Sequence, residues 1–150
     1  MNTTIPHEGD IVLALPPRNL EKIRLPFVLV VKCFDDYASC SLLTLRRDLA
    51  THLDVILPEE MAGLGAPTVV HSFAGAKIPY SRLSTPIATC PPDVVAEVLR
   101  GRFGTPSDAY EHGWEIEPIL DRRHRQLTDM YREFQELFGM TDDPQFYPSN

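Results

Sequence analysis

Short runs of apolar and β-branched residues, separated by turn-forming residues, fill the first hundred positions of the chain. Runs of this length bounded by Gly, Pro or Asp predict strands rather than helices. Fourteen prolines in 150 residues, about twice the ordinary usage, favour short elements divided by stiff turns. The run 27–33 is apolar on both faces, which indicates a central buried strand. The predicted strands lie at 11–15, 27–33, 39–45, 53–57 and 68–73, with shorter extended pieces within 76–83 and at 86–89.

Two other stretches have apolar residues at helical spacing. Residues 94–99 follow the segment 91–93 (PPD), which is typical of a helix start, and Gly101 ends the pattern. Residues 119–139 place seven apolar side chains on one face, with Gly139 as the C-cap. Because such a stripe needs a partner surface, we expect this helix to pack on the strands or to pair with its copy in a dimer.

The order of these elements predicts the fold and its division along the chain. Five or six short strands closed by one short helix predict a mostly β (α+β) fold, a small SH3-like barrel over residues 9–102. Glycines and prolines over 103–118 predict a linker. The amphipathic helix follows at 119–139, and residues 140–150 form a loose tail. Exposed strand edges and the lone apolar helix also predict a homodimer.

The net charge of −7 is unevenly distributed along the chain. Residues 1–102 contain 10 lysines and arginines against 11 aspartates and glutamates, whereas residues 103–150 contain 4 against 10. The acidity therefore belongs to the C-terminal third, and the predicted barrel is nearly neutral. The overall charge does not exclude a nucleic acid as the partner of the barrel.

Several features that define other classes of protein are missing from the sequence. No run of 18 apolar residues occurs, so neither a membrane span nor a membrane partner is expected. The N-terminus lacks the basic and apolar regions of a secretory signal, which predicts a cytoplasmic protein. In the cytoplasm, Cys33, Cys40 and Cys90 are expected to be reduced thiols. The common phosphate-loop, dinucleotide, zinc-protease and nucleophile-elbow motifs do not appear, and we expect no cofactor and no metal.

The order and spacing of several short motifs resemble those of the PemK/MazF-like toxin family. The similarity covers roughly residues 9–102. It implies an SH3-like barrel that cleaves single-stranded RNA without a metal, usually as a homodimer, and that is controlled by an antitoxin protein. DNA is not an expected partner. The matching segments are 9–13 (GDIVL), 26–31 (PFVLVV), 42–44 (LLT), 78–83 (IPYSRL), 86–88 (PIA) and the helix at 94–99.

The resemblance also implies two catalytic residues. In that family an Arg-Pro pair opens the second strand, and a Thr closes the third; both the Arg and the Thr are tied to catalysis. The RNA 2′-hydroxyl attacks the neighbouring phosphate, which requires proton transfer and donors for the developing charge. Thr44 matches the family pattern, but Leu25 stands before Pro26 where the family has Arg. Arg24 is the displaced candidate, although on a strand it would face the opposite side unless a bulge re-aims it.

Three further arginines are candidate substrate-binding residues: Arg46 and Arg47 after the third strand, and Arg82 within 78–83. Each candidate also has a plainer interpretation. Arg24 fits a solvated loop charge, Thr44 an ordinary strand residue, and Arg46 and Arg47 charges at a strand edge. Arg82 fits an anchor of the barrel or of its dimer edge.

His71 lies in an apolar run with no carboxylate near it in the sequence. This position is more typical of a satisfied core histidine than of a general base.

Two functions are therefore compatible with the sequence. The first is a PemK/MazF-like ribonuclease of a toxin–antitoxin system, favoured by Thr44 and the near-neutral barrel. The second is a catalytically inert SH3-like barrel that serves as a protein-interaction module, favoured by Leu25 and the acidic arm. Segment 108–117 of that arm (DAYEHGWEIE) carries four acidic residues and two aromatic ones, and it is a candidate to lie along an RNA groove in cis.

Overall fold

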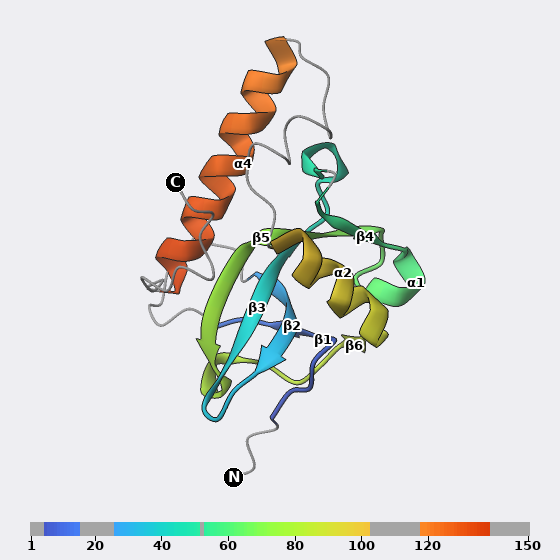
Figure 1. Cartoon of the computed structure of the whole chain (residues 1–150), viewed down its shortest axis with the longest axis vertical. Helices are drawn as coiled ribbons and strands as arrows, with labels where there is room; N and C mark the ends of the chain where they lie inside the picture. The colour runs from blue at the N-terminus through green and yellow to red at the C-terminus, as the bar shows by residue number, and fades with distance from the viewer. Residues whose placement is uncertain (1–4, 16–25, 52, 103–117, 139–150) are drawn as a thin grey trace.

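The computed structural model describes residues 5–15, 26–51, 53–102 and 118–138. Within these residues, six strands form one antiparallel sheet in the spatial order β4-β5-β3-β2-β1-β6. The sheet curls into a half-barrel (Figure 1), so the predicted mostly β, α+β barrel fold is confirmed. The strands are β1 (Asp10–Leu13), β2 (Phe27–Cys33), β3 (Tyr37–Thr44), β4 (Val55–Leu57), β5 (Thr68–Pro79) and β6 (Ala88–Thr89).

Strand β5 differs from its prediction. Instead of separate pieces at 68–73 and within 76–83, the chain forms one 12-residue strand, Thr68–Pro79. The reason is a bulge opposite β3: Ser41 pairs with Gly75, but the next residue, Leu42, pairs with His71. Three residues of β5 are absorbed at this point without ending the strand, which bends it and redirects its side chains.

The helices are α1 (Glu59–Ala62), α2 (Pro92–Arg102) and α4 (Pro118–Leu137), with 3₁₀ turns η1 (Arg47–Leu49) and η2 (Tyr80–Arg82). The helices predicted from residues 94–99 and 119–139 are both confirmed by α2 and α4. None of the helices in the described part of the chain is long and apolar enough to cross a membrane. The predicted tail at 140–150 and all of the predicted linker except Pro118 lie outside the described residues, as does segment 108–117.

Side chains alternate between two apolar layers on opposite faces of the sheet. Along β2, Val28 and Val30 enter one buried cluster, whereas Leu29 and Val31 enter the other. The prediction that residues 27–33 form a strand buried on both faces is therefore confirmed. The second cluster includes Val94, Val95 and Val98 of α2, so α2 covers that face.

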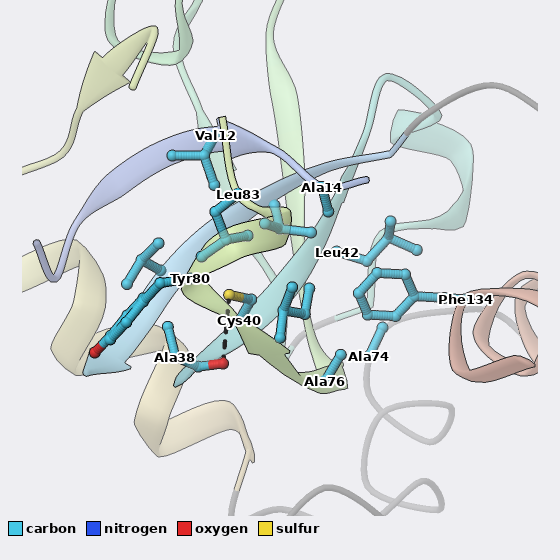
Figure 2. Close-up of a cluster of buried hydrophobic side chains, with 13 residues drawn as sticks. Val12, Ala14, Ala38, Cys40, Leu42, Ala74, Ala76, Tyr80, Leu83 and Phe134 are labelled. Atoms are coloured by element: carbon cyan, nitrogen blue, oxygen red, sulfur yellow. Dashed lines mark hydrogen bonds between the residues drawn. The ribbon is translucent and has the colours of Figure 1, made fainter. Parts of the chain in front are cut away.

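Helix α4 covers the other face of the sheet. Phe134 is buried in the first cluster (Figure 2), and Leu127, seven positions earlier, packs with Leu49 of η1. The spacing of seven places both side chains on one stripe of the helix. The apolar face of α4 thus finds its partner surface in the same chain, as the first of the two predicted arrangements requires.

Candidate functional site

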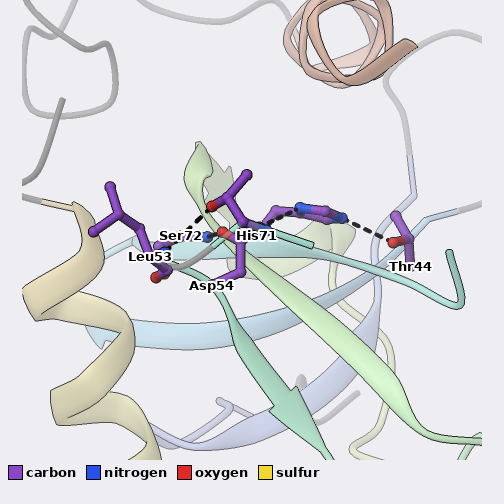
Figure 3. A network of polar contacts seen from close by, with 6 residues as sticks. Thr44, Leu53, Asp54, His71 and Ser72 are labelled. Atoms are coloured by element: carbon purple, nitrogen blue, oxygen red, sulfur yellow. Dashed lines mark hydrogen bonds and ion pairs between the residues drawn. The ribbon is translucent and has the colours of Figure 1, made fainter. Parts of the chain in front are cut away.

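Three polar side chains from separate elements meet where β3 ends (Figure 3). Thr44 Oγ1 lies 2.8 Å from His71 Nε2 on β5, and His71 Nδ1 lies 3.1 Å from an oxygen of Asp54, just before β4. The side chains of His71 and Asp54 are 0% exposed, whereas Thr44 is partly exposed. We refer to these three residues as the triad. Within it, the hydroxyl of a partly exposed residue is connected to a fully buried imidazole and carboxylate.

The pairing of β3 with β5 explains why Thr44 and His71 meet. Thr44 is directly opposite Val69, and Leu42 is opposite His71. Thr44 and His71 are therefore diagonal neighbours on one face of the ladder, a spacing that longer side chains can bridge. The bulge starts directly after His71, so this contact lies at the last regular pair before the strand bends.

Asp54 is fixed by the loop that leads into β4. One of its oxygens accepts the Thr51 N–H at 2.9 Å as well as His71, and the other accepts the Ser72 N–H at 3.1 Å. Both oxygens of Asp54 already accept a backbone N–H, and an ionised carboxylate can only accept, so we assign the hydrogen of this contact to His71 Nδ1. In the neutral imidazole Nε2 is then the acceptor, and the Thr44 hydroxyl donates to it.

The C-terminal turn of α2 supports the triad from behind. A Cβ on Gly101 would lie only 2.2 Å from the Leu53 carbonyl oxygen and 2.7 Å from Ser72 Oγ. The Ser72 hydroxyl in turn donates to the Leu53 carbonyl at 2.8 Å. The absence of a side chain at Gly101 therefore lets α2 approach the backbone on both sides of Asp54.

Arg102 extends this support into the bulge. Its guanidinium donates to the Ser72 carbonyl at 3.1 Å, to Ser39 Oγ at 2.7 Å and to the Cys40 carbonyl at 3.3 Å, and it also bonds Ser41 Oγ. Burial lowers the pKa of Arg102 to about 10. The guanidinium thus connects β3 to the bulged part of β5 and fixes the residue that follows His71.

Helix α4 closes over the triad from the front. The Tyr131 ring meets the His71 ring edge-on, with the ring centroids 5.8 Å apart and the planes at 70°. The His71 side chain has no exposed surface beneath this contact. The described contacts thus leave Thr44 as the triad member that can meet a substrate.

The predicted arginines occupy different settings. Arg46 binds Asp48 through two nitrogens, at 2.9 and 2.7 Å, and reaches Gln126 of α4 at 3.3 Å. Arg47 begins η1 and is exposed. Both follow Thr44 closely in the chain, and their role in binding substrate stays a prediction. Arg24, with Leu25, lies outside the described residues.

Arg82 lies in η2, at the junction of this turn with β1. Its carbonyl accepts the Leu15 N–H at 2.8 Å, and the next residue, Leu83, bridges to Ala14. The backbone at Arg82 therefore joins η2 to the end of β1, which fits the interpretation as a barrel anchor. Substrate binding by its guanidinium stays a prediction.

The partnership of His71 with Asp54 was not predicted from the sequence. The expectation that no carboxylate accompanies His71 is wrong, because the chain returns Asp54 from 17 residues upstream. The expectation that His71 is buried and satisfied is confirmed. One signal pointed to Asp54: it is the single charged residue at the start of an apolar run, where burial requires partners.

A metal site and a pocket are the alternatives to the triad. No group of three or more His, Cys, Asp or Glu side chains that could hold a metal ion occurs among the described residues. A pocket of about 250 Å³ lies between α2 and the start of β4, lined by Leu53, Asp54, Val55, Glu97, Arg100 and Gly101. Thr44 is not part of its lining, so this pocket does not lead to the hydroxyl of the triad.

The geometry defines a small curled-sheet domain whose helix-covered hydroxyl–imidazole–carboxylate triad lies at the end of β3. A scan against protein-family models finds no family that matches the sequence, and a search of curated proteins finds no match either.

Proposed function

We propose that the chain is a PemK/MazF-like endoribonuclease that cleaves single-stranded RNA without a metal ion. The observation that carries this proposal is the hydrogen bond of Thr44 to the buried His71. Thr44 is the residue for which the family resemblance implies a catalytic role, and it ends the third strand as the resemblance requires. The bond gives this hydroxyl an imidazole partner that can accept its proton.

The proposed chemistry is internal attack in RNA. The 2′-oxygen forms a bond to the adjacent phosphorus while the bond to the 5′-oxygen breaks, which leaves a 2′,3′-cyclic phosphate and a 5′-hydroxyl. The attacking hydroxyl must lose a proton, and the phosphorane oxygens must be stabilised. Thr44 supplies the hydroxyl group at the reacting centre. Arg46 and Arg47, with Arg24, supply positive charge for the phosphate.

The second candidate is the inert barrel that serves as a protein-interaction module. Two observations favour it: Leu25 replaces the family's Arg, and Arg46 is already bound to Asp48 and Gln126. An antitoxin protein and a homodimer are further proposals that follow from the resemblance. Both are tested by gel filtration with light scattering, alone and with the product of any adjacent small gene.

The test is RNA cleavage in EDTA. Purified full-length protein is incubated with long mixed-sequence RNA beside Thr44→Val and Thr44→Ser. The matched control is Thr68→Val, which removes a buried threonine hydroxyl and its 3.0 Å bond to the Ala66 carbonyl elsewhere on β5. We expect cyclic-phosphate ends from the wild type, Thr44→Ser and the control, and a loss of about 10²-fold or more in Thr44→Val. If no folded protein cleaved the RNA, the ribonuclease proposal would be wrong and the protein-interaction module would be the remaining candidate.

A further inference from the structure

We infer that Asp54 and His71 form a proton relay that acts through Thr44, so that Thr44 Oγ1 takes the proton of the attacking 2′-hydroxyl while its own proton moves to His71 Nε2. This inference rests on the proposed function for its substrate. The relay itself also makes a prediction about Thr44 that needs no RNA.

The direction of the hydrogen bonds supports the relay. Asp54 accepts two backbone N–H groups and the Nδ1–H of His71, so His71 Nε2 is left as an acceptor aimed at the Thr44 hydroxyl. A hydroxyl that donates to an imidazole nitrogen has its oxygen lone pairs free for another donor. The 2′-hydroxyl of a bound nucleotide is such a donor.

The burial of the three residues supports the same conclusion. His71 and Asp54 have no exposed side-chain surface, so neither can touch RNA directly. A base in this position can act only through a neighbouring group, and Thr44 is the partly exposed neighbour. Exclusion of water by α4 strengthens the attraction between the carboxylate and an imidazolium formed during the reaction.

The proton balance of the step closes without a further reagent. As the O2′–P bond forms, the 2′-hydroxyl proton passes to Thr44 Oγ1 and the Thr44 proton passes to His71 Nε2. The imidazolium is held by Asp54. The departing 5′-oxygen takes a proton from water, and His71 returns its proton to water through Thr44. The free enzyme is regenerated with the same tautomer.

The same relay makes Thr44 a nucleophile toward small phosphorylating reagents. With diisopropyl phosphofluoridate, a bond forms from Thr44 Oγ1 to phosphorus, the P–F bond breaks and fluoride leaves. The hydroxyl proton again moves to His71 Nε2. This reaction reports on the relay independently of any RNA substrate.

The experiment measures both reactions in one set of full-length variants: Thr44→Val, Thr44→Ser, His71→Gln and Asp54→Asn. His7→Gln is the matched control, because His7 is exposed and lies at Asp10 rather than in the triad. Thermal unfolding confirms that each variant is folded at the assay temperature. We expect His71→Gln and Asp54→Asn to lower kcat by about 10²–10⁴-fold with KM little changed. Labelling of Thr44, located by peptide mass spectrometry, should fall in parallel, and Thr44→Ser should retain both activities.

The outcomes separate the relay from the proposed function. Cleavage and labelling at wild-type levels in folded His71→Gln would overturn the relay and leave RNA cleavage by Thr44 intact. Labelling of Thr44 that depends on His71, without any RNA cleavage, would overturn the proposed function and keep the relay. Absence of labelling at Thr44 in the wild type also counts against the relay. An RNA with sulfur in place of the 5′-oxygen gives one more check, because a sulfur leaving group needs no proton. If His71→Gln and Asp54→Asn cleaved this RNA as fast as the wild type, the triad would act on the leaving group and not on the 2′-hydroxyl.

Discussion

Arg102 shows how one side chain determines the geometry of a site that it does not touch. Its guanidinium bonds Ser39, Ser41 and the carbonyl of Ser72, and it thereby spans the bulge between β3 and β5. The bulge, in turn, directs the Ser72 N–H to Asp54 and leaves His71 facing Thr44. The buried charge is retained because the guanidinium bonds two carbonyl oxygens and two hydroxyl oxygens.

At Gly101 we expect the substitution Gly→Ala to destabilise the protein, which is the opposite of its usual effect in a helix. Gly→Ala inside a helix ordinarily raises the free energy of unfolding by about 0.5–1 kcal/mol. In Gly101→Ala the new methyl group would overlap the Leu53 carbonyl, so we expect a loss of about 1–3 kcal/mol. Urea denaturation checks the stability, and RNA cleavage should also fall because Leu53 and Ser72 flank the triad. An unchanged or higher stability would contradict the close approach of α2.

The buried thiols predict a loss of stability at high pH. Burial raises the pKa of Cys40, so the folded chain keeps this proton where the unfolded chain releases it. The folded state then binds more protons, and the free energy of unfolding falls as the pH rises above the ordinary Cys pKa.

Between about pH 8 and pH 10, the Cys40 thiol alone should account for a fall of about 1–2 kcal/mol in the free energy of unfolding. Urea denaturation gives the free energy of unfolding of the wild type and of Cys40→Ala at both pH values. The contribution of Cys40 is the amount by which this free energy falls more in the wild type than in Cys40→Ala. Arg102, whose lowered pKa acts with the opposite sign near pH 10, is present in both proteins. An equal fall in both proteins would show that Cys40 does not stay protonated in the fold.

At the scale of elements, periodicity predicted the features of single strands and helices, because each depends on one continuous segment of the chain. The two-sided burial of β2, the start of α2 and the apolar stripe of α4 all follow from local patterns, and the structure has all three. The continuity of β5 does not follow from such patterns, because its bulge pairs with β3 and is bonded by Arg102, which lies 30 residues beyond Ser72.

The same limit explains why only part of the candidate site was predicted. Thr44 was identified through the resemblance to the PemK/MazF-like family, because the segment 42–44 that carries the resemblance is contiguous in the sequence. His71 and Asp54 become partners only when β5 pairs with β3 and the loop before β4 folds back on them. The periodicity of a single segment cannot predict a contact between residues 54 and 71.

Helix α4 is expected to be an integral part of the folded unit. Phe134 is buried in a cluster shared with β1, β2, β3 and β5, so Phe134→Ala should lower the free energy of unfolding by about 3–5 kcal/mol. Arg132→Ala is the matched control, since Arg132 is exposed on the same helix with a surface pair to Asp129, and we expect it to cost less than about 1 kcal/mol. Denaturant unfolding measures both. Equal, small effects would mean that α4 is an appendage that the barrel does not need.

At the scale of the whole molecule, the triad lies between two helices that are far apart in sequence. The end of α2 packs behind Asp54 and Ser72, and α4 packs in front of His71. His71 and Ser72 are consecutive residues of β5 that serve opposite faces, so we expect a change on one side of the sheet to reach the other. Changes at either helix should therefore alter the position of Thr44.

The place of α4 along the chain has a consequence for how the protein is made. This helix follows every strand of the sheet in chain order, yet it supplies the buried Phe134 and the ring that covers His71. During synthesis the strands emerge first, while one apolar face of the sheet and the imidazole are still open to water. The dry environment on which the relay depends is completed only when α4 docks, so a partly synthesised chain would hold the three residues without yet having a working site.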